Sequence, residues 1–133
     1  MFRVIIAGSR GFWSQDLMDR TMDSLLQNKQ AEPIEILSDN GRGAPRFGEI
    51  YARKRGYSLK HFDTDWDQYG KAAPYLRNLE MTDQADACVV FWDGETRFEK
   101  YMINAAKFTK IPVRVIKYRS PQRELFNEPL PPG

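Results

Sequence analysis

A chain of 133 residues has the length of one domain, and it is long enough to bury a hydrophobic core without disulfide bonds. A hydrophobic fraction of 41% and a charged fraction of 29% argue against a disordered protein. Lysine and arginine total 20 against 18 acidic residues, and the resulting net charge of +2 gives no argument for nucleic acid or an anionic membrane as a partner.

The sequence offers little metal or redox chemistry. Cys88 is the only cysteine, and its place inside an apolar run predicts a buried, inert thiol in a reducing compartment. His61 is the only histidine, so the sequence predicts no metal site and no cofactor. The apolar run at Phe2–Ala7 is too short for a signal peptide or a membrane span, and we therefore expect a cytoplasmic protein.

Apolar runs alternate with segments of helical periodicity along the chain. The expected strands are Phe2–Ala7, Pro33–Leu37, Leu59–Phe62, Asp86–Trp92 and Pro112–Ile116. The expected helices cover about 15–29, 45–55, 74–84 and 97–110. Residues 63–67 are expected to form a polar loop, and the segment 119–133 is expected to be a proline-rich tail outside the domain 1–118.

Capping residues and apolar spacing define the expected helices further. Ser14 is the predicted N-cap of the first helix, and Gly56 is the predicted C-cap of the second. In the third helix, Tyr75, Leu76 and Leu79 are expected to face inward. The fourth helix is expected to begin with a capping box of the T-x-x-E type.

This alternation predicts an α/β fold, a Rossmann-like three-layer α/β/α sandwich with a five-stranded, mainly parallel sheet. The expected strand order, 3-2-1-4-5, places the loops 8–12 and 93–96 side by side at the point where the strand order reverses. The loop 39–44 is expected beside the first of them. Ligands bind at such an edge in open α/β sheets, so we expect a site there.

Two glycine-rich loops at this edge each carry an arginine. Gly8-Ser9-Arg10-Gly11 combines free backbone N–H groups, a hydroxyl and a guanidinium, which together favour phosphate binding. Asn40-Gly41-Arg42-Gly43-Ala44 repeats this composition, so that two arginines could clamp a phosphate. Either segment could equally be an ordinary turn with a solvated arginine.

Other polar and aromatic residues near the same edge have both a binding and a structural interpretation. Trp66 and Trp92 could stack on a base or could be rim or core aromatics. Arg77 could contact a ligand or could pair with Glu80 on the helix surface. Glu99 could be catalytic or could close the capping box with Thr96, as the T-x-x-E spacing indicates.

Several of these motifs together resemble the YspA-like branch of the SLOG superfamily, whose Rossmann-like domains are related to the LOG phosphoribohydrolases and the DprA/Smf proteins. The resemblance covers about 1–118. The residues that carry it are, in chain order, Ile5–Arg10, Arg42–Ala44, Asp65-Trp66, Tyr69–Ala73, Arg77-Asn78, Met81 and Phe91–Gly94. It implies a nucleotide or nucleotide-derived ligand at the edge identified above, and family analogy implies a homodimer.

The sequence also departs from this family in two loops. Asp39 and Asn40 stand where the family has two glycines, and Phe98-Glu99 stand where it has Gly-Thr after the fourth strand. The catalytic glutamate of the LOG enzymes would fall near Tyr101, so hydrolysis of a nucleoside monophosphate is not implied.

The sequence therefore favours binding or sensing of a nucleotide or nucleotide-derived ligand, such as an ADP-ribose-like molecule, over catalysis. The expected ligand-binding residues are Gly8, Ser9, Arg10, Arg42, Gly43, Asp65, Trp66, Lys71, Arg77, Asn78, Trp92, Asp93, Gly94, Glu95 and Thr96. Two alternatives stay open. One is a phosphoribohydrolase or N-glycosidase type of nucleotide hydrolase, with Asp93, Glu95 or Glu99 as acid or base. The other is a protein-interaction or inhibitory module on a degenerate SLOG scaffold.

Overall fold

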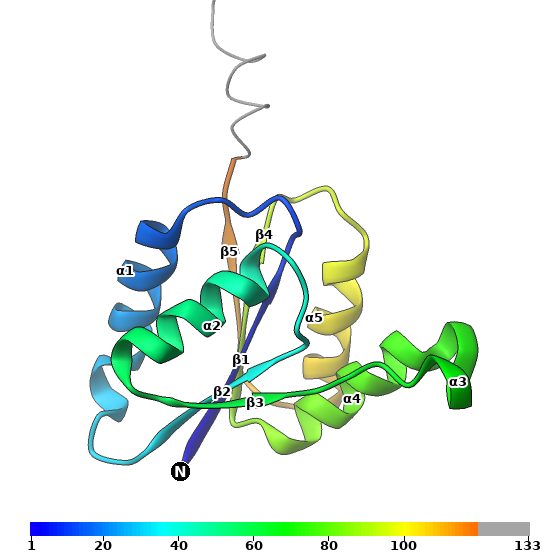
Figure 1. Cartoon of the computed structure of the whole chain (residues 1–133), viewed down its shortest axis with the longest axis horizontal. Helices are drawn as coiled ribbons and strands as arrows, with labels where there is room; N and C mark the ends of the chain where they lie inside the picture. The colour runs from blue at the N-terminus through cyan, green and yellow to red at the C-terminus, as the bar shows by residue number, and fades with distance from the viewer. Residues whose placement is uncertain (120–133) are drawn as a thin grey trace, which may run out of the picture.

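The computed structural model of the chain describes residues 1–119 (Figure 1). Its strands are β1 Phe2–Gly8, β2 Ile34–Ser38, β3 Ser58–His61, β4 Ala87–Trp92 and β5 Val113–Lys117. Its helices are α1 Gln15–Leu26, α2 Ala44–Arg55, α3 Trp66–Tyr69, α4 Ala73–Gln84 and α5 Phe98–Thr109, with 3-10 turns at Gln27–Lys29 and Gly70–Ala72. The predicted proline-rich tail lies, beyond Arg119, outside the described residues.

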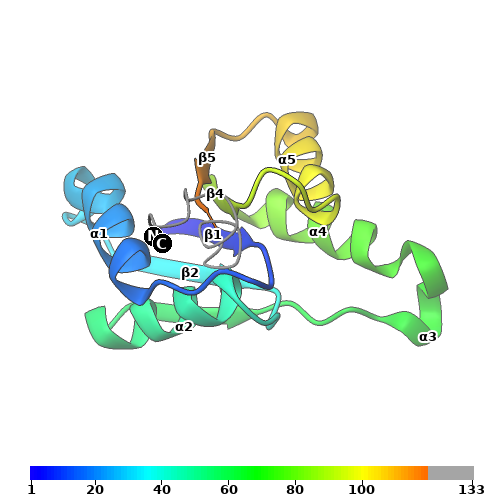
Figure 2. The ribbon, with the colours of Figure 1, turned by 90° about the horizontal axis from the view of Figure 1, so that it is seen from above.

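The five strands form one parallel sheet in the order β3-β2-β1-β4-β5, which confirms the predicted strand order. β1 lies in the centre, with Val4 opposite Ile36 of β2 and Ile6 opposite Val89 of β4. The helices α1 and α2 cover one face of the sheet, and α4 and α5 cover the other (Figure 2). The architecture is therefore a three-layer α/β/α sandwich of the Rossmann-like kind.

β1 is buried on both faces because its side chains alternate between two hydrophobic clusters. Val4 and Ile6 belong to the cluster beneath α1 and α2, whereas Ile5 and Ala7 belong to the cluster beneath α4 and α5. A parallel strand covered by helices on both sides requires such a continuous apolar run. Cys88 of β4 lies in the second cluster, and its burial raises the pKa of the thiol to about 12.

Two predicted caps are present in the structure. The Ser14 side chain accepts a hydrogen bond from the backbone N–H of Leu17 at the start of α1. Gly56 ends α2 in the left-handed conformation, and its N–H returns to the carbonyl oxygens of Ala52 and Arg53. No helix within residues 1–119 has both the length and the apolar composition needed to cross a membrane.

The segment before α4 differs from the prediction. Residues 63–65 lie in a loop as expected, but Trp66 and Asp67 begin the short helix α3, which the Asp65 carboxylate caps by accepting the backbone N–H of Gln68. In α4, Tyr75 and Leu76 are 43% and 40% exposed, so the expected inward orientation is wrong for both. The face that α4 buries instead carries Ala73, Asn78, Met81 and Thr82.

Candidate functional site

Ser9 joins the loops that follow β1, β2 and β4 at the carboxyl edge of the sheet. Its backbone N–H donates to the Phe91 carbonyl at 2.9 Å, and its own carbonyl accepts the Ala44 N–H at 3.1 Å. Its hydroxyl accepts the Asp93 N–H at 3.3 Å and lies 3.2 Å from the Thr96 hydroxyl. The loops meet as predicted, but Ser9 is buried and its N–H is engaged, so it offers no backbone donor to a phosphate.

Two of the predicted site glycines are required by this close packing. A Cβ on Gly8 would lie 2.2 Å from the Phe91 carbonyl oxygen, and a Cβ on Gly43 would lie 2.2 Å from the Ser9 carbonyl oxygen. Gly43 also has a φ of 73°, which side-chain-bearing residues rarely adopt. Loop packing thus accounts for both glycines without any ligand.

The loop after β4 is held by its own hydrogen bonds. One carboxylate oxygen of Asp93, Oδ1, accepts the Glu95 N–H at 2.8 Å and the Thr96 N–H at 3.0 Å, and also the Thr96 hydroxyl. The predicted capping box is wrong: α5 begins after Arg97, which makes no side-chain cap. The Thr96 hydroxyl donates to the Glu99 carboxylate instead, and the Glu99 side chain is almost fully buried.

The Trp92 side chain is held by contacts with its own loop, the core and β5. Its indole N–H donates to the Thr96 carbonyl at 2.8 Å, and its ring packs against the core cluster beneath α4 and α5. The Lys117 ammonium lies 5.9 Å from the ring centroid. These contacts join β4 to its loop and to β5. Trp92 does not line any of the three cavities that form the cleft at this edge.

Three adjoining cavities form a cleft at the carboxyl edge, which we name the aromatic chamber, the arginine rim and the deep notch. The chamber, of about 250 Å³, is lined by Trp66, Lys71, Pro74, Tyr75, Arg77, Asn78, Phe98 and Tyr101. The rim, of about 330 Å³, is lined by Gly8, Arg10, Asp39, Gly41, Arg42, Pro45, Trp66, Pro74, Arg77, Phe98 and Glu99. The notch, of about 60 Å³, is lined by Ala7, Gly8, Asp39, Arg77, Asn78, Phe98, Glu99 and Met102.

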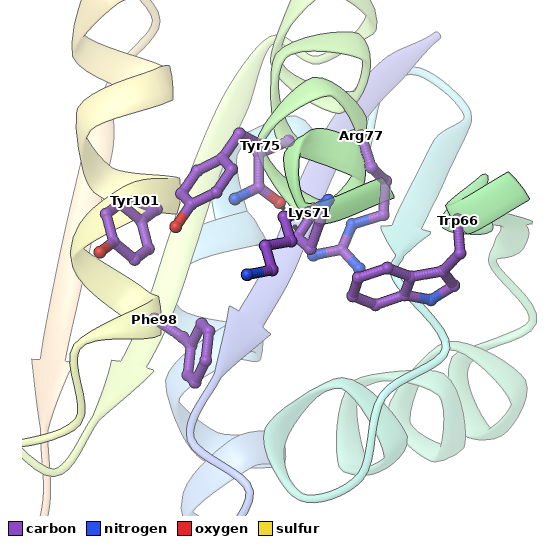
Figure 3. Close-up of a pocket in the computed structure, with 8 residues that line it drawn as sticks. Trp66, Lys71, Tyr75, Arg77, Phe98 and Tyr101 are labelled. Atoms are coloured by element: carbon purple, nitrogen blue, oxygen red, sulfur yellow. Dashed lines mark hydrogen bonds between the residues drawn. The ribbon is translucent and has the colours of Figure 1, made fainter. Parts of the chain in front are cut away.

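Aromatic side chains from three helices surround the chamber (Figure 3). Trp66 of α3 lies on one side, and Tyr101 and Phe98 of α5 lie on the other, with Lys71 reaching into the space between them. Tyr75 and Tyr101 pack edge to face at a centroid distance of 4.7 Å. Trp66 and Phe98 are 59% and 73% exposed, so their faces are accessible to a flat ligand.

Arg77 occupies the boundary of all three cavities. Its Nη1 donates to the Thr64 hydroxyl at 2.7 Å, and its Nη2 donates to the Asn78 amide oxygen at 3.1 Å. Nη2 also lies 3.6 Å from a carboxylate oxygen of Asp39, and within residues 1–119 Arg77 forms its ion pair with Asp39 rather than with Glu80. The Arg77 Nε is buried and has no hydrogen-bond partner within residues 1–119.

Asn78 and Glu99 form the buried polar floor of the notch, and they are 5% and 9% exposed. The Asn78 oxygen accepts from Arg77, and its amide NH₂ makes no hydrogen bond in the described part of the chain. One Glu99 oxygen accepts from Thr96, and the other has no donor among those residues. This amide group and this carboxylate oxygen are therefore open to pairing with water or a ligand in the notch.

The structure divides the predicted binding residues into two groups. Those that line the cleft are Gly8, Arg10, Arg42, Trp66, Lys71, Arg77 and Asn78. Those that do not line it are Ser9, Gly43, Asp65, Trp92, Asp93, Gly94, Glu95 and Thr96. Of the weak catalytic candidates, Glu99 alone lies in the cleft.

Sequence reasoning missed several residues of the cleft, chiefly Asp39, Tyr75, Phe98 and Tyr101. The helical spacing of Tyr75 predicts an inward side chain, and the sequence assigns no site role to Phe98 or Tyr101, although Phe98 is the second most exposed large hydrophobic residue within 1–119. A signal did exist for Asp39 and Phe98, because both depart from the pattern that the chain otherwise resembles.

Comparisons with known proteins give one relative. Neither a protein-family model nor a solved structure matches the chain. The Gene 61 protein of Mycobacterium phage D29 is 32% identical over 123 residues, and the similarity covers 85% of this chain and 94% of the phage protein. The chain therefore belongs to the family of the phage Gene 61 protein.

Proposed function

We propose that the protein binds a nucleotide or nucleotide-derived ligand, carrying both ribose and phosphate, in the carboxyl-edge cleft. The observation that carries this proposal is the junction of an aromatic chamber with a rim that holds Arg10 and Arg42. A nucleotide has two corresponding parts, a flat base and an anionic phosphate. Stacking of a base on an aromatic side chain contributes roughly 1–3 kcal/mol, and guanidinium groups bind phosphate in a bidentate geometry.

The position of the cleft supports the same proposal. β1 and β4 are neighbours in the sheet, and the strand order reverses between them. Open α/β sheets bind ligands beyond the carboxyl ends of the strands at this point. The motif resemblance to the YspA-like branch of the SLOG superfamily also supports a nucleotide-derived ligand. The exposed Trp66 and Phe98 would hold the base, and Arg10 and Arg42 would hold the phosphate.

Isothermal titration calorimetry with AMP, ADP-ribose and the cyclic ADP-ribose isomers tests the proposal. We expect at least one of these ligands to bind at sub-millimolar concentration. Trp66→Ala should weaken binding by about tenfold because the stacking surface is lost. Trp13→Ala is the matched control, since Trp13 is 50% exposed and lies outside the cleft.

The arginine rim has its own matched pair of variants. Arg42→Gln should weaken nucleotide binding by about tenfold, because a charge-assisted contact to phosphate is lost. Arg46→Gln removes the same charge from an exposed position on α2 that does not line the cleft. Failure of every nucleotide to bind, or equal losses in both variants, would overturn the proposal.

A second candidate function is hydrolysis of an N-glycosidic bond, and the position of Glu99 favours it. This carboxylate is not used as a helix cap, is almost fully buried, and lines the rim and the notch beside Arg77. The carboxyl group of Glu99 could give its proton to the departing base as the glycosidic C–N bond breaks, and the resulting carboxylate could take the proton that water loses as it adds to the sugar carbon. The test is adenine release from AMP or ADP-ribose. The hydrolase proposal fails if release is no faster with the protein than without it, or if Glu99→Gln leaves the rate unchanged.

A further inference from the structure

We infer that Asp39 and Glu99 make the deep notch a subsite for the ribose hydroxyls of the ligand and confine its phosphates to the arginine rim. This inference rests on the proposed nucleotide binding and specifies which part of the ligand enters which part of the cleft. Asp39 and Glu99 line both the notch and the rim, whereas the two exposed arginines, Arg10 and Arg42, line the rim and not the notch.

The charges around the notch disfavour phosphate. Asp39 and Glu99 line it with the single guanidinium of Arg77, so the lining carries one more negative charge than positive. Arg77 is also already engaged with Asp39 at 3.6 Å and with two further acceptors. The rim adds Arg10 and Arg42 to the same three groups, which makes its lining positive by one charge. A phosphate is therefore more stable at the rim than in the notch.

The unpaired polar groups of the notch select the kind of ligand atom that fits. One Glu99 oxygen is an acceptor without a donor, and the Asn78 NH₂ is a donor that makes no hydrogen bond among residues 1–119. The unpaired Arg77 Nε is fully enclosed and is therefore not among the groups open to a ligand. A sugar hydroxyl both donates and accepts, so a vicinal diol can satisfy the carboxylate and the amide together. A fully ionised phosphate only accepts, and it would leave Glu99 unpaired beside a like charge.

The size of the notch agrees with this assignment. Its volume of about 60 Å³ has room for roughly four water molecules, which corresponds to the hydroxyl-bearing edge of a ribose. A purine base would not enter it. The aromatic chamber, with a volume of about 250 Å³, shares Arg77, Asn78 and Phe98 with the notch, so a base in the chamber would lie next to its own ribose.

The decisive experiment compares ligands on the unmodified full chain by calorimetry. AMP is titrated beside 2′,3′-dideoxy-AMP, and ADP-ribose is titrated beside the analogue that lacks the 2′ and 2″ hydroxyls. We expect at least one hydroxyl-bearing ligand to bind about tenfold or more tightly than its deoxy analogue, since hydrogen bonds to charged groups are lost. Because no variant is involved, this comparison does not depend on the folding of a mutant.

Two variants locate the effect at the notch. Glu99→Gln should reduce the preference for the hydroxyl-bearing ligand to about threefold or less, whereas Glu80→Gln, an exposed carboxylate on α4, should leave it unchanged. Asp39→Asn should increase the affinity for inorganic phosphate by about fivefold or more, because it releases Arg77 and removes a negative charge. Thermal unfolding verifies that each variant is folded.

The outcomes separate this inference from the proposed function. If nucleotides bind but the deoxy analogues bind equally well, the inference is wrong and the nucleotide-binding proposal stands. The same conclusion follows if Glu99→Gln and Glu80→Gln alter the preference alike, or if Asp39→Asn gains no affinity for phosphate. If no nucleotide-derived ligand binds, both the proposed function and the inference are rejected.

Discussion

The two sides of the edge differ in how their polar groups are satisfied. In the loop after β4, Asp93 accepts three hydrogen bonds from its own loop, and Trp92 donates to the Thr96 carbonyl. On the opposite side, Asn78 has an amide group, and Arg77 a buried nitrogen, without partners in the described chain. The loop after β4, which most resembles a binding loop, is thus a turn that satisfies its own polar groups. The unpaired polar groups lie across the cleft from it.

The physical reason for this difference is distance along the backbone. An Asp side chain reaches N–H groups two and three residues ahead of it, so a short loop can satisfy its own carboxylate. Asn78 and Arg77 lie on a helix, whose backbone groups bond to one another, and their side chains must find partners on other elements. Where those partners do not suffice, a polar group stays open for a ligand.

The largest expected effect tests whether the loops really depend on close packing. Gly8→Ala would place a Cβ 2.2 Å from the Phe91 carbonyl oxygen and should lower the free energy of unfolding by about 3 kcal/mol. Gly11→Ala is the control, since a Cβ there meets nothing within 4 Å and should change stability by about 0.5 kcal/mol at most. Urea denaturation measures both, and equal stabilities would show that the β1 loop is not tightly packed.

Cys88, on the strand that leads into the β4 loop, should make the free energy of unfolding depend on pH. Burial raises the pKa of Cys88 from 9.0 to about 12, so between these values the folded chain retains a proton that the unfolded chain releases. The contribution of the buried thiol to the free energy of unfolding is complete below about pH 9 and is lost as pH rises, by about 2 kcal/mol at about pH 10.5. Cys88→Ala should show a shallower decline in unfolding free energy over this range. Parallel declines for the two proteins would contradict burial of the thiol.

Asp93→Ala distinguishes a structural loop from a binding loop. It removes the acceptor of three hydrogen bonds and should lower the free energy of unfolding by about 1.5 kcal/mol. Asp93→Asn keeps the acceptor oxygen and should lose less. Affinity for AMP or ADP-ribose, measured on the folded variants by calorimetry, should stay within about threefold. A much larger loss of affinity than of stability would place Asp93 on the ligand.

The smallest expected effect concerns the two tryptophans. Trp92→Phe loses one hydrogen bond to the Thr96 carbonyl and should lower the free energy of unfolding by about 1 kcal/mol. Its nucleotide affinity should stay within about twofold, because the side chain does not line the cleft, whereas Trp66→Ala should lose about tenfold. If the two variants lose affinity alike, the contrast between the two sides of the cleft is wrong.

Much of the fold could be predicted from the sequence because its signals are local. The apolar runs, the Ser14 cap and the Gly56 cap act within a few residues, and the strand order follows from the short crossovers. The same reasoning placed Arg10 and Arg42 at the correct edge of the sheet. It missed α3, a short helix capped by the Asp65 carboxylate that begins within the last two residues of the expected loop 63–67.

Most of the candidate site was decided by the tertiary structure. The pair between Asp39 and Arg77 joins residues 38 positions apart in sequence, and no periodicity predicts it. In the expected capping box, Glu99 would accept the Thr96 backbone N–H. That N–H donates to Asp93, so the Glu99 carboxylate accepts the Thr96 hydroxyl and remains in the cleft. Local sequence determined which elements form and in what order. The choice among competing partners for each polar side chain depended on which loops met in the folded chain.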